Sequence, residues 1–343
     1  MTMPIIEIRS HQREILIDQI LTRVDPDHIH RGEYYVEKSR TDIRHTLDFT
    51  LESLAIRQKS ILVQYYRWLI ETLSHYAIGE EPLLAMFAAV KTALHPFLDA
   101  DENAFLASIP ETEIREKKAF SHASAPDLIP EANAYLGLLL GKDRHGAAHF
   151  LERLIQQGMP MEEVFVHVIQ SAMVEVGRLW QTRIIDVADE HMATVITQSA
   201  MTQLYPLLFD TKKNGKRLVA LALGDELHEI GIRMVADLFE WKGFETEYLG
   251  ANMPSSSVLD HLRKRPPHLV ALSVKVATHL SRLTKLIQDL RDEPGLKSLK
   301  IIIGGQAVAG IPDAARVFGA DGFAFDAAAA VREGERLVGI TRS

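Results

Sequence analysis

Residues 226–231 combine a carboxylate, an imidazole and a glycine in the pattern Glu-x-His-x-x-Gly. They follow an apolar run, 218–223, that is typical of a buried strand. A carboxylate at Glu226 would take the proton of one ring nitrogen of His228, which leaves the other nitrogen free to bind a metal. Gly231 would let the next helix begin close to a bulky ligand. The pattern predicts a metal-binding imidazole, although it also fits an ordinary histidine in a strand–helix loop.

Two further features come at the ends of later apolar runs. Ser273 ends the run 269–273, and Gly304-Gly305 follows the strand-like run 300–303. Open parallel sheets bind their ligands at the carboxyl ends of the strands. We therefore expect these residues to share one edge of a sheet with His228.

Order and strand context together resemble the cobalamin-binding domain family, whose signature is Asp-x-His-x-x-Gly, then Ser-x-Leu, then Gly-Gly. The resemblance covers roughly residues 215–338 and implies that His228 is the lower axial ligand of cobalt. It further implies that Ser273 and the glycine pair line a slot for the nucleotide tail of the cofactor. The chain departs from the signature twice, with Glu226 in place of Asp and Lys275 in place of Leu. The cofactor contacts expected in this region are Glu226, Leu227, His228, Gly231, Ser273, Val274, Gly304 and Gly305.

The composition limits the classes of function. The chain has 343 residues, a net charge of -8, 47% hydrophobic residues and no cysteine. This length predicts two or three domains, and the negative charge argues against a broad nucleic-acid surface. Without cysteine, disulfides, thiolate metal sites and thioether-linked chromophores are excluded. No apolar run reaches the roughly 18 residues of a membrane span, and no signal peptide is recognised, so we expect a cytoplasmic protein.

Three regions are expected along the chain. Residues 215–343 alternate strands and helices, which indicates a doubly wound, Rossmann-like α/β domain. Residues 127–209 contain four helices with short turns, which predicts a four-helix bundle, and residues 1–120 form an all-α domain. The strands are expected near 217–223, 245–249, 268–273, 299–303 and 321–323, and the N-terminal helices near 6–24, 40–57, 59–77, 82–98 and 101–119.

The predicted bundle carries polar and aromatic residues of its own. Trp180 falls near the end of the third helix, and Glu190-His191 falls early in the fourth. A short turn between antiparallel helices would bring all three to one end of the bundle. The indole could then pack against a cofactor substituent, and the carboxylate could hydrogen-bond a ribose hydroxyl. Taken alone, Trp180 also fits a core residue.

The pattern Trp-x9-Glu-His resembles the B12-dependent photoreceptors, a light-sensing subfamily of adenosylcobalamin proteins. The resemblance implies that the bundle caps the upper face of the corrin and that Trp180, Glu190 and His191 contact the adenosyl group. Glu226 in place of Asp is also typical of this subfamily. Gln181 departs from it, because there a histidine takes the cobalt after illumination; here His191 or water would take that place.

Residues 1–120 lack a recognisable DNA-reading module but contain aromatic and histidine side chains at helical spacing. Trp68 and His75, for example, lie seven residues apart and would share a helix face. Resemblance to photocobilins, which pair a B12 domain with a biliverdin-binding helical domain, implies a non-covalent bilin pocket. The same residues also fit a helical core with surface histidines, and the region fits a partner-docking module. The expected pocket residues are Tyr35, Tyr65, Trp68, His75 and His95.

Two functions from different classes follow. The first is a photoreceptor, a signalling protein rather than an enzyme. In it, light cleaves the cobalt–carbon bond of adenosylcobalamin and changes homo-oligomer assembly or binding to an unknown protein partner. The alternative is a corrinoid methyl carrier of a methyltransferase system. Trp180 with Glu190-His191 favours the photoreceptor, and no nucleic-acid or membrane partner is expected. A radical mutase is disfavoured, because its barrel alone needs roughly 250 residues.

Overall fold

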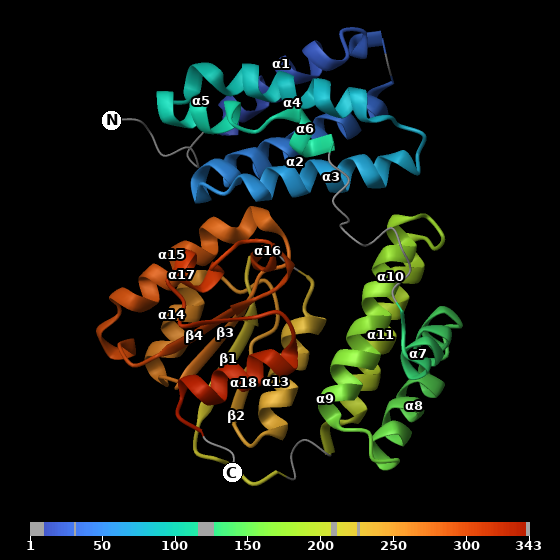
Figure 1. Ribbon diagram of the computed structural model, residues 1–343, viewed down its shortest axis with the longest axis vertical. Helices are drawn as coiled ribbons and strands as arrows, with labels where there is room; N and C mark the ends of the chain where they lie inside the picture. Colours follow the sequence, from blue (N-terminus) through green and yellow to red (C-terminus); the bar gives the residue numbers. More distant parts are fainter. Residues whose placement is uncertain (1–9, 31, 116–126, 207–210, 225–226, 341–343) are drawn as a thin grey trace. The chain divides into compact units, whose positions relative to one another are not determined.

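The structure, a computed structural model, describes residues 10–30, 32–115, 127–206, 211–224 and 227–340. The chain divides into two compact units, Met1–Phe120 and Ser121–Ser343, called unit 1 and unit 2 below (Figure 1). Among the described residues, no helix has both the length and the apolar character needed to cross a membrane.

Unit 1 is helical throughout its described residues. Its core packs Tyr66 against Phe87 with ring centroids 5.1 Å apart, and both side chains are fully buried. Its elements are α1 (Ser10–Val24), η2 (His28–His30), α2 (Glu33–Ile56), α3 (Lys59–Ser74), α4 (Glu80–Leu94), η3 (His95–Phe97), α5 (Ala100–Ala107) and α6 (Glu111–Arg115).

Several expected helix boundaries in unit 1 are wrong, two of them because of proline. The helix expected over 82–98 ends as α4 at Leu94, and Pro96 lies in the 3₁₀ turn η3. The helix expected over 101–119 is interrupted before Pro110, with α6 following it. Proline lacks the backbone N–H and clashes with the preceding turn, so a helix does not run through it. The helix expected from residue 40 begins earlier, at Glu33, directly after the N-cap residue Gly32.

The first part of unit 2 is a bundle of helices, called the cap below. Its third helix is continuous from α9 through α10 and contains a π-helical stretch, η4, that the sequence did not reveal. The fourth helix, α11, begins with a capping box in which Asp186 accepts from the Asp189 backbone N–H. The cap elements are α7 (Pro130–Leu140), α8 (Arg144–Gln156), α9 (Met161–Glu163), η4 (Val164–Gln170), α10 (Ser171–Gln181) and α11 (Val187–Gln203).

The rest of unit 2 is a five-stranded parallel sheet in the order β2-β1-β3-β4-β5. Helices α13 and α18 pack on one face, and α14, α15 and α17 lie on the other (Figure 1). The expected multidomain fold, with an all-α region, a helical cap and a doubly wound α/β domain, is confirmed. The elements are β1 (Arg217–Ala222), α13 (Ile230–Trp241), β2 (Glu245–Tyr248), α14 (Ser255–Lys264), β3 (Leu269–Ser273), η5 (Ala277–His279), α15 (Leu280–Asp292), η6 (Pro294–Leu296), β4 (Lys300–Gly304), α16 (Gln306–Ala309), α17 (Ala314–Phe318), β5 (Gly322–Ala324) and α18 (Ala327–Leu337).

The cap and the sheet domain share one hydrophobic core. Phe165 of the cap and Phe239 of α13 are fully buried members of the same apolar cluster. An ion pair between Lys242 Nζ and Glu162 Oε1, 2.6 Å apart, joins the end of α13 to α9. Buried apolar area is the main stabilising term in such packing, so the cap is held as part of one body with the sheet.

Candidate functional site

The carboxyl edge of the sheet aligns the strand ends that carry or precede the three sequence features. The parallel register pairs Ala222 with Ser273 and Ser273 with Gly304. The chain moves from β1 outward to β2 and then back to β3 on the other side, so β1 and β3 form a topological switch point. Doubly wound sheets bind their ligands outside the carboxyl ends of the strands at such a point.

His228 lies in the loop after β1, at the centre of a tight turn. The Glu229 backbone N–H donates to the Leu227 carbonyl at 2.9 Å, which closes a three-residue turn around His228. His228 is exposed, and Leu227 is 80% exposed. A Cβ added to Gly231 would meet no protein atom within 4 Å, so this side of the loop is open. Glu226, the expected partner of His228, lies outside the described residues.

The end of β3 and the glycine pair form a backbone layer beside this loop. Ser273 is half-buried, and its carbonyl accepts from the Leu223 N–H at 2.9 Å. The Val274 N–H donates to the Gly304 carbonyl at 3.0 Å, and Val274 itself is only 1% exposed. Gly305 has φ +95°, and a Cβ there would press on the Val274 backbone. The glycine is therefore required by the close approach of two backbone segments.

The three cap residues lie near the turn between α10 and α11. Trp180 is 42% exposed at the end of α10, and Glu190 and His191 lie in the first turns of α11. Glu190 Oε2 and His191 Nδ1 are 2.7 Å apart, so the carboxylate orients the imidazole. Gln181, in contrast, is buried.

His191 also lines a hollow in the cap, without Trp180 among its lining residues. The hollow has a volume of about 410 Å³, and its other lining residues are Arg144, Val187, Ala188, Met192 and Val195. The structure thus brings Glu190 and His191 together, but it does not place Trp180 in that hollow.

Helix α11 reaches from these residues to the His228 loop. Gln198 Nε2 donates to Glu229 Oε1 at 2.8 Å, and His191 precedes Gln198 by seven residues. Residues seven apart share a helix face and lie about 10 Å apart along the axis. The face of α11 that meets the His228 loop therefore extends towards the N-terminus of the helix as far as His191.

These residues fit a large flat cofactor that needs one imidazole from the protein. The described residues contain no group of three or more His, Cys, Asp or Glu side chains that could hold a metal ion alone. A corrin ring brings the equatorial ligands of its own cobalt. An exposed His228 on an open loop, with Gly231 leaving space beside it, suits the lower side of such a ring.

Comparison with known proteins agrees with this geometry. One B12 binding domain model matches residues 132–205, and another matches residues 216–333. These two regions are B12-binding domains. The first covers most of the cap, and the second covers the sheet domain with His228, Ser273 and the glycine pair.

Similar proteins carry the word corrinoid in their names. Monomethylamine corrinoid protein 2 of Methanosarcina mazei is 26% identical over 183 residues, which are 51% of this chain and 84% of that protein. Dimethylamine corrinoid protein 1 of Methanosarcina acetivorans is 27% identical over 187 residues, 54% of this chain and 82% of that protein. The solved monomethylamine corrinoid protein of Methanosarcina barkeri has a TM-score of 0.53 at 20% identity, covering 62% of this chain and 98% of its own. That likeness supports the fold.

Two of the five residues expected in the bilin pocket are in contact, because the Tyr65 and Trp68 rings stack with centroids 6.3 Å apart. Tyr65 is a core residue, 6% exposed, that stacks on Phe49 with ring centroids 4.0 Å apart. Its hydroxyl is 3.0 Å from Thr46 Oγ1, and burial raises its pKa to about 12. Tyr35 and Trp68 are partly exposed on α2 and α3, and His75 caps the end of α3.

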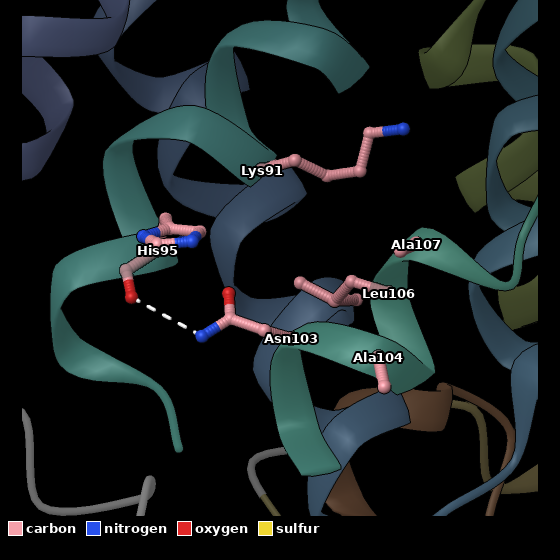
Figure 2. A pocket seen from close by; sticks show the side chains of 6 residues that line it. All are labelled: Lys91, His95, Asn103, Ala104, Leu106 and Ala107. Atoms are coloured by element: carbon pink, nitrogen blue, oxygen red, sulfur yellow. Dashed lines mark hydrogen bonds between the residues drawn. The ribbon is translucent and has the colours of Figure 1, made fainter. Parts of the chain in front are cut away.

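His95 lies in a different setting from the other four. It lines a hollow of about 430 Å³ at the end of α4 (Figure 2), and none of the other four contributes to that hollow. This hollow does not bring His95 together with the other four, and a bilin pocket formed by the five side chains stays a prediction. The hollow is lined by Lys91, His95, Asn103, Ala104, Leu106 and Ala107.

Sequence reasoning missed the polar contacts between cap and sheet domain. Arg233 Nη2 donates to Thr202 Oγ1 at 2.7 Å and to the Tyr205 hydroxyl at 3.1 Å. Glu229 and Arg233 are four residues apart on one element, and Gln198 and Thr202 are four apart on the other. Polar residues four apart on an apolar helix face can indicate a polar contact with another helix. The sequence alone does not reveal which two helices meet.

Asp237, one turn beyond Arg233, predicts a pH dependence of stability. It is 7% exposed, and burial raises its pKa from 3.8 to about 7, although Arg233 lowers it in part. Between these values the folded chain keeps a proton that the unfolded chain releases, so stability falls as pH rises from 4 to 7 and is level above. We expect Asp237→Asn to remove this fall and to stabilise the chain by about 2–4 kcal/mol at pH 8. Urea unfolding of both proteins at several pH values measures the free energy of unfolding as a function of pH. If this dependence is the same in both proteins, Asp237 is not the group responsible.

Proposed function

We propose that this chain is a corrinoid methyl carrier. This function is the alternative to the photoreceptor in the sequence analysis. The observation that carries the proposal is the aligned row of Ala222, Ser273 and Gly304 at the edge of a B12-binding domain, with His228 in the loop that follows β1. The mono- and dimethylamine corrinoid proteins among its relatives support methyl transfer over light sensing. As a carrier, the chain would act on a methyl group only together with a separate catalytic protein.

Different residues of unit 2 would contact different parts of the cofactor. When bound, cobalamin supplies a cobalt that accepts and releases a methyl group. His228 would present a ring nitrogen from below, and the backbone layer of Val274 and Gly305 would bound the nucleotide-tail slot. From above, the exposed Trp180 and the Glu190–His191 pair would limit access of water to the reactive face.

The test is reconstitution of the full chain with hydroxocobalamin. We expect cobalamin to stay bound through gel filtration, and the reduced cobalt(II) form to show nitrogen splitting in its electron paramagnetic resonance spectrum. Labelling histidine with ¹⁵N should change that splitting from a triplet to a doublet, because the two isotopes differ in nuclear spin. His228→Ala should lose the response to labelling, whereas His261→Ala, on the outer helix α14, should keep it. A wild-type spectrum that ignores the label would overturn the assignment of His228.

A specific observation keeps light sensing as the second candidate. Trp180 is 42% exposed, and Glu190 fixes the His191 ring 2.7 Å away, an arrangement that could hold an adenosyl group. The same reconstitution decides between the two functions when methylcobalamin and adenosylcobalamin are compared in the dark. A carrier should retain methylcobalamin at least as well, with no change in oligomer mass under green light. A strong preference for adenosylcobalamin, with a light-dependent mass, would instead favour the sensor.

A further inference from the structure

Glu229, the residue after His228, uses both of its carboxylate oxygens in cross-links. Oε1 accepts from Gln198 Nε2 of cap helix α11 at 2.8 Å. Oε2 accepts from the Tyr248 hydroxyl at the end of β2 at 3.0 Å. One side chain therefore ties the His228 turn both to the cap and to the neighbouring strand.

The Tyr248 contact has a fixed direction. Tyr248 is half-buried, and burial raises its pKa above the ordinary tyrosine value, with the Glu229 carboxylate adding to the rise. The phenol keeps its proton throughout the physiological range, so it always donates to Glu229. Hydrogen bonds to an ionised acceptor are stronger than neutral ones.

Arg233 adds a second cross-link one helical turn along α13. Its guanidinium donates to the Gln198 carbonyl at 3.2 Å as well as to Thr202 and Tyr205, and it lies over the Tyr205 ring at 5.3 Å. Two successive turns of α13 thus hold two successive turns of α11. Movement of α11 away from the sheet would have to break the Gln198–Glu229 contact at the very residue that follows His228.

We propose that Glu229 is a positioning residue that couples His228 to the cap, so that the imidazole is aimed at cobalt only while α11 is docked. This inference rests on the proposed binding of cobalamin by His228. The backbone hydrogen bond from Glu229 to Leu227 makes the coupling direct, because Glu229 closes the turn that has His228 at its centre. Release of Gln198 removes the side-chain contact of Glu229 with the cap and leaves its contact with Tyr248.

The experiment measures the share of cobalt(II) that carries the ¹⁵N-histidine signature in full-length variants loaded with cobalamin. Mutation of a residue that orients a metal-bound histidine typically lowers the metal affinity by about 10–100-fold. We expect Glu229→Ala to reduce the histidine-bound to histidine-free ratio by about tenfold or more. Glu229→Gln should restore most of it, because its carbonyl oxygen accepts from Gln198 and its amide can donate to Tyr248.

Two further variants separate coupling from general loosening. Gln198 belongs to cap helix α11 rather than to the His228 turn, yet Gln198→Ala should lower histidine ligation in the same direction as Glu229→Ala. Glu162→Ala removes the cap–sheet ion pair with Lys242, which lies at the far end of α13 from His228. It should leave the histidine signature unchanged at a similar loss of thermal stability.

The outcomes distinguish the two levels of the proposal. If His228→Ala loses the signature while Glu229→Ala and Gln198→Ala keep it, the coupling is wrong and cobalt ligation by His228 stands. Equal losses in Glu162→Ala and Gln198→Ala would also overturn the coupling, since any weakened cap would then suffice. If the wild-type chain loaded with cobalamin shows no histidine signature, cobalt ligation by His228 is wrong, and the proposed function loses its basis.

Discussion

Replacing Gly305 by alanine is expected to abolish retention of cobalamin and to lower the free energy of unfolding of unit 2 by about 2–5 kcal/mol. Gly305 has φ +95°, a conformation that side chains with a Cβ rarely adopt. The added Cβ would also lie 2.7 Å from the Val274 carbonyl carbon, within a rigid backbone layer. Urea unfolding of the apo chain and gel filtration with cobalamin measure the two effects.

Gly231 offers the matched control for this prediction. Its added Cβ meets no protein atom within 4 Å, and it lies in the first turn of α13. Alanine there should leave apo stability unchanged or raise it by up to about 1 kcal/mol. Cobalamin affinity should nevertheless fall if the corrin occupies the open space. A Gly305→Ala chain that unfolds at the wild-type urea midpoint would refute the close-approach argument.

The sheet domain could be predicted from the sequence because its signals are local and agree with one another. Central strands of a parallel sheet are buried on both faces and read as continuous apolar runs. The runs around Val219, Val270 and Ile302 are such strands, and all three residues are nearly fully buried. Helix α13 begins at Ile230, between β1 and β2, as the expected alternation of strands and helices requires. The edge row of the site follows once the strands are known, since parallel carboxyl ends must share an edge.

Features that depend on contacts between distant segments could not be predicted. The cross-link from Glu229 to Gln198 joins residues 31 apart in the chain, and no local pattern states that α11 meets the His228 loop. The π-helical stretch η4 has the same apolar periodicity as an ordinary helix. The stacking of Tyr65 on Phe49 could not be predicted either, because aromatic spacing alone does not separate a core stack from a binding surface.

The upper side of the site shows a further limit of short motifs. The motif predicts adenosyl contacts for Trp180 and Glu190-His191, and the structure places all three near one turn of the cap. The same cap could cover a cobalt that carries either a methyl or an adenosyl group. The choice between carrier and photoreceptor therefore depends on relatives and on ligand preference, rather than on these three residues.

Removing the Glu175 carboxylate is expected to destabilise the cap strongly. Glu175 and Arg178 form a two-bonded ion pair, with oxygen–nitrogen distances of 2.6 and 2.7 Å. Their side chains are only 7% and 11% exposed. Glu175→Ala leaves the guanidinium buried without this partner, which costs about 3–5 kcal/mol. Thermal and urea unfolding followed by circular dichroism measure the loss.

The double variant Glu175→Leu with Arg178→Leu tests the reason for that loss. Replacing both charges by apolar side chains removes the desolvation cost along with the attraction, so the pair should be near neutral or stabilised by about 1–4 kcal/mol. Equal destabilisation in the single and double variants would mean that shape, rather than the uncompensated charge, decides. Arg178 lies two residues before Trp180 on α10. If the double variant folds well and still retains cobalamin, the ion pair serves the stability of the cap alone; if it folds but loses the cofactor, the pair also sets the position of Trp180 over the corrin.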